Sequence, residues 1–147
     1  MKKIKLTKGY YTLVDDDKFE FLSQFKWHYS NGYAMRRVGK KILQMHRVLL
    51  NTPVGKDTDH INRYSLDNRL VNLRICNRSE NNLNKPKQSN NTSGFKGVFW
   101  RNDKKLWRAR VGNKYAGMFK SKIDAAKAYD KVAKKIYGDF AKLNFNV

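Results

Sequence analysis

Several residue types are scarce in this sequence of 147 residues, and each scarcity excludes a class of protein. Cys76 is the only cysteine, which excludes an internal disulfide and any zinc site built on paired thiolates. No apolar run approaches the roughly 18 residues that a membrane-spanning helix requires. The charged start, Met1-Lys2-Lys3, lacks the apolar stretch of a secretory signal behind it. We therefore expect a cytoplasmic protein without a membrane partner.

Acidic residues are also scarce, because 12 Asp and Glu stand against 32 Lys and Arg, a formal net charge of +20. An excess of this size points first to a polyanionic partner. The hydrophobic fraction of 40% is high enough to build real cores, so wholesale disorder is not expected. The length suits one medium domain or two small ones.

A polar stretch divides the chain into two parts. Residues 84–94 contain proline and glycine, lack hydrophobic periodicity and read as a linker. We place the linker at 86–93, between a domain at 1–85 and a second at 94–147. The charge excess divides equally, +10 in residues 1–94 and +10 in 95–147, so it is not confined to a tail.

Residues 1–45 show the pattern of a small mixed α+β unit. A strand is expected at 9–14, and the dipeptide Asn31-Gly32 between aromatic strand residues is a strong type I′ hairpin signal. Gly39-Lys40 indicates a second turn. Asp15-Asp16-Asp17 could bind a cation, but a cap on the helix that follows is the favoured interpretation.

Residues 46–85 contain a more informative pattern of polar residues. The segments are Asp59-His60, then Asn72-Leu73-Arg74 beginning 12 residues after His60, then Ser79-Glu80-Asn81 ending 9 residues after Asn72. The local signals predict a strand, a turn-rich loop, a second strand and a helix starting at Ser79. Taken singly, each of these residues has a structural explanation, such as a buried histidine or a turn-forming asparagine.

In combination, these segments resemble the HNH endonucleases, in particular the branch found in phage and intron homing enzymes. The resemblance implies a ββα-metal motif at about 56–85 that cuts phosphodiester bonds with one divalent cation, Mg²⁺ or Mn²⁺. It implies His60 as general base, Asp59 and Asn81 as metal ligands, and Asn72 as the residue that holds the loop and orients His60. It also implies a bacterial or phage-infected cell as the setting.

The chemistry of these residue types agrees with that reading independently. A histidine with a pKa near ~6.5 can accept a proton from water, and a carboxylate with an amide oxygen suits a hard cation. Neighbours on a strand point to opposite faces, so Asp59 and His60 either face one point because the strand ends there or approach the phosphate from two sides. At the third position of the HNH motif, where the family name has histidine, this sequence has Asn81. His46 is interpreted as structural, and His28 has no identifiable functional partner.

The pattern becomes regular after the linker. Alternating strands are expected at 97–101, 107–111 and 114–119, and Ser121 to Asp124 forms a capping box that opens a helix ending at Gly138. The expected fold class is therefore α+β throughout, and this second domain is a three-stranded antiparallel sheet packed on one α-helix.

Three segments of this domain, Ser93 to Val98, Ala125 to Asp130 and Ala141 to Phe145, resemble the apetala-two/ethylene-response-factor DNA-binding domain. That family lays its sheet in the major groove. The resemblance implies a DNA-binding face made of Lys96, Phe99, Arg101, Arg110, Lys114 and Tyr115. The two lysines of this face are expected to contact phosphates. Alternation adds Arg108 to the face of Arg110. Phe99 stands where the plant domains have arginine, so their target sequence does not carry over, and an ordinary solvated sheet face remains the alternative.

The leading hypothesis is a homing-type, site-directed endonuclease that acts on double-stranded DNA, nicks one strand per site and needs no obligate protein partner. A DNA-binding transcriptional regulator without catalysis is the alternative. An RNA-binding protein of ribosomal character is a third class.

Overall fold

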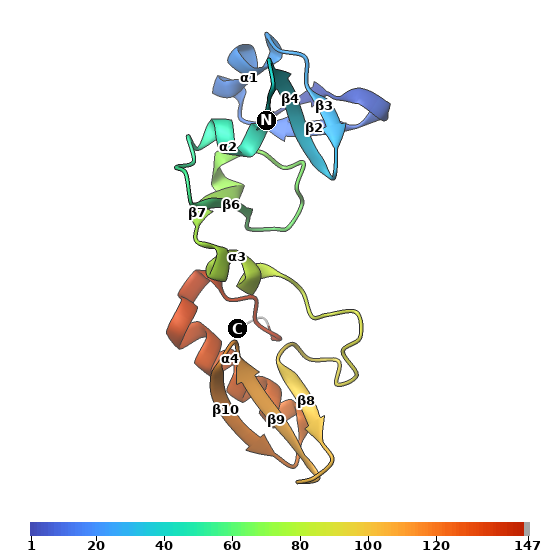
Figure 1. Ribbon diagram of the computed structural model, residues 1–147, viewed down its shortest axis with the longest axis vertical. Coiled ribbons are helices and arrows are strands. Elements are labelled where there is room, and N and C mark those ends of the chain that lie inside the picture. The colour runs from blue at the N-terminus through green and yellow to red at the C-terminus, as the bar shows by residue number, and fades with distance from the viewer. Residues whose placement is uncertain (146–147) are drawn as a thin grey trace. The chain divides into compact units, whose positions relative to one another are not determined.

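The computed structural model describes residues 1–145 and has the α+β architecture that the sequence predicts. The chain forms two compact units, Met1–Asn81 and the residues from Asn82 on. The division falls inside helix α3 (Arg78–Asn84). Figure 1 labels the helices and strands of both units.

The first unit begins with two antiparallel strands, β1 (Lys2–Lys5) and β2 (Tyr11–Val14), joined by the 3-10 turn η1 (Thr7–Gly9). Helix α1 (Asp16–Ser23) follows and buries Leu22. The strand expected at 9–14 is therefore two residues shorter, and β1 was not predicted because its lysines hide its short apolar pattern. The core of the unit consists of Ile4, Leu6, Val14, Leu22, Trp27, Ala34, Met45 and Leu66.

A three-stranded meander comes next, formed by β3 (His28–Ser30), β4 (Tyr33–Val38) and β5 (Lys41–Gln44). Both predicted turns are confirmed. Ser30 pairs with Tyr33 across Asn31 and Gly32, whose φ angles of 49° and 87° have the positive sign that a type I′ turn requires. Val38 pairs with Lys41 across the second turn.

The three aspartates at the start of α1 do not cap the helix with their side chains as predicted. Asp15 occupies the N-cap position, but its carboxylate accepts a hydrogen bond from the backbone N–H of Leu70 at 2.7 Å instead of from its own helix. Asp16 lies 2.6 Å from the amino terminus, and Asp17 lies 2.9 Å from Lys18. The capping interpretation is wrong because a distant loop supplies the donor.

The predicted order of strand, loop, strand and helix is confirmed after β5. Helix α2 (Met45–Leu49), which was not predicted, leads into the strand pair β6 (Asp57–His60) and β7 (Leu73–Cys76) and then into α3 (Figure 1). The short 3-10 turn η2 (Leu70–Asn72) precedes β7. Helix α3 starts one residue before Ser79.

The start of α3 is set by a reciprocal pair of hydrogen bonds. The N–H of Glu80 donates to Oδ1 of Asn77 at 2.9 Å, and the N–H of Asn77 donates to the Glu80 carboxylate at 2.7 Å. This is a capping box with asparagine in the first position, and it stabilises the helix that carries Asn81.

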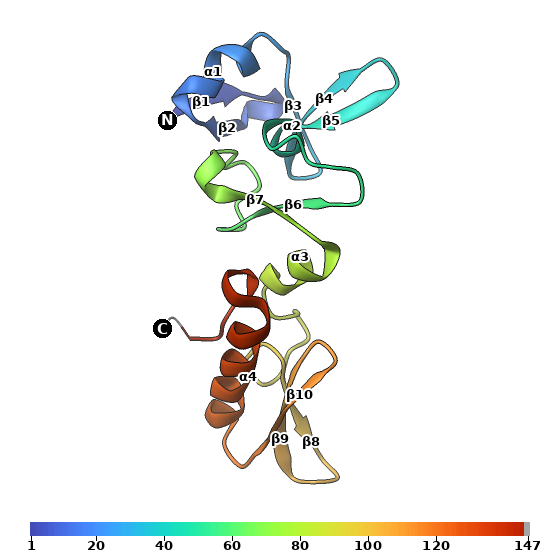
Figure 2. The ribbon, with the colours of Figure 1, turned by 90° about the vertical axis from the view of Figure 1, so that its left-hand side faces the viewer.

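The second unit is a three-stranded antiparallel sheet with one long helix. Its strands β8 (Val98–Arg101), β9 (Leu106–Val111) and β10 (Lys114–Phe119) lie in the order β10-β9-β8. Figure 2 shows α4 (Lys122–Tyr137) along one face of this sheet, and the 3-10 turn η3 (Gly138–Phe140) follows it. The core consists of Val98, Ala109, Val111, Ala125, Ala126, Tyr129 and Ala133.

Gly97 brings the start of β8 close to α4. Its φ is +70°, and a Cβ there would lie 2.2 Å from the ring of Tyr129 and 2.5 Å from the carbonyl oxygen of Arg110. The close packing of sheet on helix therefore requires glycine. The predicted cap at Ser121 is confirmed, because its side chain accepts from the N–H groups of Ile123 and Asp124.

A buried carboxylate fastens the C-terminal segment to α4. Asp130, 6% exposed, accepts hydrogen bonds from the backbone N–H groups of Asn144 at 2.8 Å and Phe145 at 2.9 Å. The side chain of Asn144 in turn bonds the backbone of Lys96 in both directions. Residues 86–93 contain no helix or strand.

Candidate functional site

His60 is the last residue of β6, and its imidazole is held by Asn68. The two side chains are buried, 6% and 1% exposed, and Nε2 of His60 lies 3.0 Å from Oδ1 of Asn68. Burial lowers the pKa of His60, while the hydrogen bond to Asn68 and the charges of Asp59 and Asp67 oppose that effect. The ring is therefore biased toward the neutral form, which is the form that accepts a proton.

Asn72 joins the two ends of the loop between β6 and β7. Its Oδ1 accepts from the N–H of Asn62 at 2.9 Å, and its Nδ2 donates to the carbonyl oxygen of Asp67 at 2.8 Å. Its own carbonyl oxygen accepts from the N–H of Ile61 at 2.9 Å. Asn72 thus acts on the loop backbone, whereas Nε2 of the His60 ring has Oδ1 of Asn68 as its hydrogen-bond partner.

The segment that carries Asn68 is docked on β2 by backbone hydrogen bonds. The N–H of Leu13 donates to the carbonyl oxygen of Leu66 at 2.8 Å, and the N–H of Asn68 donates to that of Leu13 at 2.9 Å. Between them, Asp67 is 1% exposed and binds the guanidinium of Arg69 at 2.7 Å. That ion pair lowers the pKa of Asp67. The N-terminal strand pair is thus part of the framework of the site.

Asp59 lies beside Arg74 on the neighbouring strand, because the register of β6 and β7 places the two residues opposite each other. The guanidinium donates to Oδ2 of Asp59 from Nε at 2.9 Å and from Nη2 at 2.7 Å. The side chains are 8% and 14% exposed. Asp59 therefore forms a mostly buried, two-bond ion pair with Arg74.

Asn81 lies on α3 and contacts strand β6. Its Nδ2 donates to Oδ2 of Asp57 at 3.2 Å. Asp57 and Asp59 lie two residues apart on β6 and so share one face of it, while His60 occupies the alternate position at the strand end. The arrangement brings Asp59 and Asn81 to one side of β6 and His60 to its terminus.

A second histidine packs against His60. The ring of His46, on α2, meets that of His60 edge to face with centroids 5.0 Å apart, and the ring of Tyr33 lies 5.2 Å from His46. Burial together with the nearby charges of His60 and Arg47 lowers the pKa of His46 to about 3. Within residues 1–145, its Nδ1 has no hydrogen-bond partner.

The side chains implied as metal ligands, Asp59 and Asn81, include an asparagine. A cluster made only of ionisable side chains is therefore not expected at this site. Across the described residues no three His, Cys, Asp or Glu side chains gather as a metal site. The oxygen donors of Asp59 and Asn81 are of the kind that Mg²⁺ prefers. Their chemistry fits a hard cation held by few protein ligands.

The outward face of the second unit carries an arginine between two aromatic rings. The guanidinium carbon of Arg108, on β9, lies 5.6 Å from the ring centroids of both Phe99, on β8, and Tyr115, on β10. Phe99 is 36% and Tyr115 59% exposed. In residues 1–145 the Nε of Arg108 is buried without a hydrogen-bond partner.

The other four residues expected at this interface have internal partners or lie at its edge. Arg101 forms a two-point ion pair with Asp103 at 2.9 and 3.0 Å. Arg110 donates to the carbonyl oxygen of Gly112 and to Asn113 in the turn before β10. Nζ of Lys96 donates to the carbonyl oxygen of Lys85 at 2.6 Å, and Lys114 is exposed at the start of β10.

Asn68 and Thr12 are not among the site residues that the sequence predicts. Nδ2 of Asn68 donates to Oγ1 of Thr12 at 2.7 Å, across 56 positions of the chain. The dipeptide before Arg69 offered a local signal for Asn68. No local signal identifies Thr12, because its role depends on a contact between distant segments.

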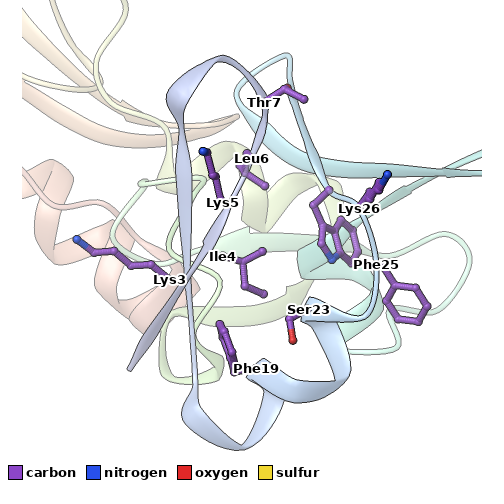
Figure 3. Close-up of a pocket in the computed structure, with 10 residues that line it drawn as sticks. Lys3, Ile4, Lys5, Leu6, Thr7, Phe19, Ser23, Phe25 and Lys26 are labelled. Carbon is purple, nitrogen blue, oxygen red and sulfur yellow. The ribbon is translucent and has the colours of Figure 1, made fainter.

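One hollow of about 480 Å³ lies elsewhere on the first unit, between β1 and α1. Figure 3 shows Ile4 among its lining residues, together with the lysines Lys3, Lys5 and Lys26. None of the candidate residues named above lines this hollow. No helix within residues 1–145 is long and apolar enough to cross a membrane.

Comparison with known proteins gives two viral relatives. The chain is 29% identical over 148 residues to a protein of Acanthamoeba polyphaga mimivirus named as an uncharacterized HNH endonuclease, covering 93% of this chain and 76% of the relative. It is 29% identical over 93 residues to Protein 3.8 of Escherichia phage T7, covering 61% of this chain and 77% of that protein. No family model and no solved structure matches the chain.

Proposed function

We propose that this protein is an HNH-type DNA endonuclease that hydrolyses one phosphodiester bond of double-stranded DNA with one divalent cation, as homing enzymes do. The observation that carries the proposal is the position of Asp59-His60 at the end of β6, paired with β7 and followed by α3, which carries Asn81. The mimivirus relative, named as an HNH endonuclease and aligned over 93% of the chain, supports the same reaction class.

His60 acts as the general base in this proposal. It accepts a proton from a water whose oxygen bonds to phosphorus while the bond from phosphorus to the leaving oxygen breaks. A buried neutral imidazole held by Asn68 suits that role. Asn72 keeps the loop closed around His60 by joining Asn62 to Asp67.

Asp59 and Asn81 would hold the cation, Mg²⁺ or Mn²⁺, through one carboxylate and one amide oxygen. When bound, the cation stabilises negative charge on the phosphate and on the leaving oxygen. Arg74 already neutralises Asp59, so the carboxylate would share its charge between the guanidinium and the cation. Two protein ligands and a competing arginine predict weak binding that the DNA phosphate completes.

In this proposal the outward face of the second unit binds the DNA. Arg108 has a guanidinium oriented between Phe99 and Tyr115, and guanidinium groups pair with guanine edges or phosphates in duplex DNA. Arg101 and Arg110 would exchange or share their partners on the protein when they meet DNA. In this proposal Lys96 and Lys114 would contact DNA phosphates. The +10 charge of residues 95–147 supports binding to a polyanion.

Incubation of supercoiled plasmid with the protein tests the cutting step. We expect relaxed, nicked circles in Mg²⁺ or Mn²⁺ and none in EDTA, because one site per chain cuts one strand. His60→Ala should abolish nicking, while His28→Ala, which changes a histidine on β3, should retain it. Asn81→Ala should lose most activity, and Asn82→Ala on the same helix should not.

The same experiment separates the proposal from the alternative of a non-catalytic DNA-binding regulator. A protein that binds the plasmid in a gel-shift assay but releases no relaxed circles under any divalent metal would be the regulator. Equal nicking by the original chain and by His60→Ala would also contradict the assigned site.

A further inference from the structure

We infer that Asn68, itself held by Thr12, fixes the neutral imidazole of His60 in the tautomer protonated at Nε2, so that Nδ1 is the atom that takes the proton from water. The catalytic meaning of this inference rests on the proposed function. The tautomer itself is a property of the DNA-free protein and is measurable without any cleavage. Asn68 and Thr12 are positioning residues, since they act through His60.

The hydroxyl of Thr12 lies within hydrogen-bond distance of a backbone carbonyl group. Its Oγ1 lies 2.8 Å from the carbonyl oxygen of Leu66. A carbonyl oxygen only accepts hydrogen bonds, and two oxygens this close would repel without a proton between them. The single hydroxyl proton of Thr12 is therefore committed to Leu66, which leaves Oγ1 as an acceptor for other groups.

The orientation of the Asn68 amide follows from that commitment. The Asn68 amide lies 2.7 Å from Thr12 Oγ1, so the group on that side must donate and is Nδ2. Its second hydrogen points toward Sδ of Met45, a weak acceptor at 3.6 Å. In the opposite orientation the amide oxygen of Asn68 would face Sδ of Met45, which is also an acceptor. The amide oxygen would also compete with the carbonyl oxygen of Leu66 for the single hydroxyl proton of Thr12.

The proton position on His60 is the last step. With Nδ2 turned toward Thr12, the Asn68 atom that lies 3.0 Å from Nε2 of His60 is the carbonyl oxygen Oδ1. Because Oδ1 only accepts, Nε2 must carry a hydrogen. A neutral imidazole has one N–H, so Nδ1 carries the lone pair.

The network is enclosed, which prevents water from replacing its members. Thr12 is 0%, Asn68 1% and His60 6% exposed. The two backbone hydrogen bonds between β2 and the segment of Leu66 to Asn68 fix the distance between Thr12 and Asn68. The hairpin of β1 and β2, far from the nuclease-like motif in sequence, is thereby linked through two side chains to Nε2 of His60, the ring nitrogen opposite the reacting one.

Nitrogen-15 NMR of the DNA-free protein at about pH 8, where an ordinary histidine is neutral, measures the tautomer directly. The two ring nitrogens of His60 are assigned by their loss in His60→Ala. We expect Nε2 at the shift of a protonated ring nitrogen and Nδ1 at that of an unprotonated one. The reverse pattern in the unaltered chain would overturn the inference.

Substitutions at Thr12 provide the matched pair. Thr12→Ser keeps the hydroxyl and should keep the Nε2-protonated spectrum. Thr12→Val keeps the shape but removes the hydroxyl, so the Asn68 amide loses the acceptor that orients it, and a mixture of both tautomers is expected. An unchanged spectrum in folded Thr12→Val would show that Thr12 does not orient Asn68.

Asn68→Asp and Asn68→Leu cover the case in which Thr12→Val fails to fold. Asp still accepts from Nε2 and should preserve the tautomer, whereas Leu offers no acceptor and should not. In the nicking assay we expect kcat of Thr12→Val to fall in proportion to the lost share of the Nε2-protonated tautomer, about 2-fold for an even mixture, with KM for DNA unchanged, while Thr12→Ser keeps the original kcat. Absence of nicking by the unaltered chain would contradict the proposed function while the tautomer measurement still stands.

Discussion

The guanidinium of Arg74 donates two hydrogen bonds to one carboxylate oxygen of Asp59, at 2.9 and 2.7 Å, across the strand pair β6–β7. The two side chains are mostly buried. Asp59 is also the residue that would bind a cation. Arg74 and the proposed cation would therefore interact with the same carboxylate, and the folded protein already pairs that carboxylate with an arginine in the absence of metal.

Replacement of Arg74 by Met should make folding depend on a divalent cation. Removing one partner of a buried pair leaves an uncompensated charge, which costs about 3–5 kcal/mol. We expect the melting temperature of Arg74→Met to fall in EDTA and to recover in part in Mg²⁺, because the cation replaces the lost positive charge. Thermal unfolding followed by circular dichroism measures both effects.

Arg69→Met is the control for that experiment. Arg69 pairs with the buried carboxylate of Asp67 at 2.7 Å, away from Asn81. This variant should also lose stability, but Mg²⁺ should not restore it. Equal recovery of both variants would mean that the cation binds buried carboxylates without selectivity and would count against Asp59 as its ligand.

Acid stability should depend on His46. Its pKa is lowered from 6.5 to about 3 in the folded chain, so between these values the unfolded chain binds a proton that the folded chain does not. Stability from this group is present above pH 6.5 and falls as the pH drops, by about 1.4 kcal/mol per pH unit. His46→Phe removes this part of the slope. Urea titrations at several pH values measure it, and parallel slopes in the two proteins would contradict it.

Cys76 should react with thiol reagents only after unfolding. The thiol is 2% exposed, donates to the carbonyl oxygen of Asp57 at 3.7 Å, and has a pKa raised to about 11, mainly by burial. This rise in the pKa of Cys76 lowers the thiolate fraction about 100-fold at a given pH. Colour release from Ellman's reagent at pH 8 should be slow in buffer and rapid in guanidinium. Rapid reaction of the folded chain would show that β6 and β7 open readily.

The Asp130 carboxylate should be a main support of the second unit. Asp130→Asn replaces an acceptor of backbone and side-chain donors with a group that presents its own N–H to them. We expect a loss of about 1–3 kcal/mol, the cost of leaving buried polar groups unsatisfied. Denaturant unfolding of the full chain measures it. Asp124→Asn, exposed in the first turn of α4, is the control and should change stability by less than about 1 kcal/mol.

Arg108 should contribute more to DNA binding than the lysines on the solvent side of α4. Arg108→Gln should weaken duplex binding about 10-fold or more and reduce the slope of log affinity against log salt by about 1 if the contact is a phosphate. An unchanged slope with altered sequence preference would indicate a base contact. Lys131→Gln, exposed on α4, is the charge-matched control. Equal loss in both variants would mean that only net charge matters.

Elements with strong local signals were predictable. The Asn31-Gly32 hairpin, the strand–loop–strand–helix order of residues 57–84 and the sheet-and-helix unit all follow from turn chemistry and hydrophobic period. Strand β1 and helix α2 were not predictable, because each is four or five residues long and stabilised by packing in the shared core. The cap expected from Asp15 failed for a related reason, since Leu70 supplied a better-placed donor.

The amino-acid sequence by itself determined the positive charge, and it predicted the two-part organisation and the candidate residues Asp59, His60, Asn72 and Asn81, because charge, turns and motif spacing are local properties. Only the tertiary structure decided which groups surround those residues. Arg74 on Asp59, His46 against His60, and the link from Thr12 through Asn68 to Nε2 are contacts between segments distant in the chain. Hydrogen-bond direction and burial depend on three-dimensional proximity, and no periodicity along the chain encodes them.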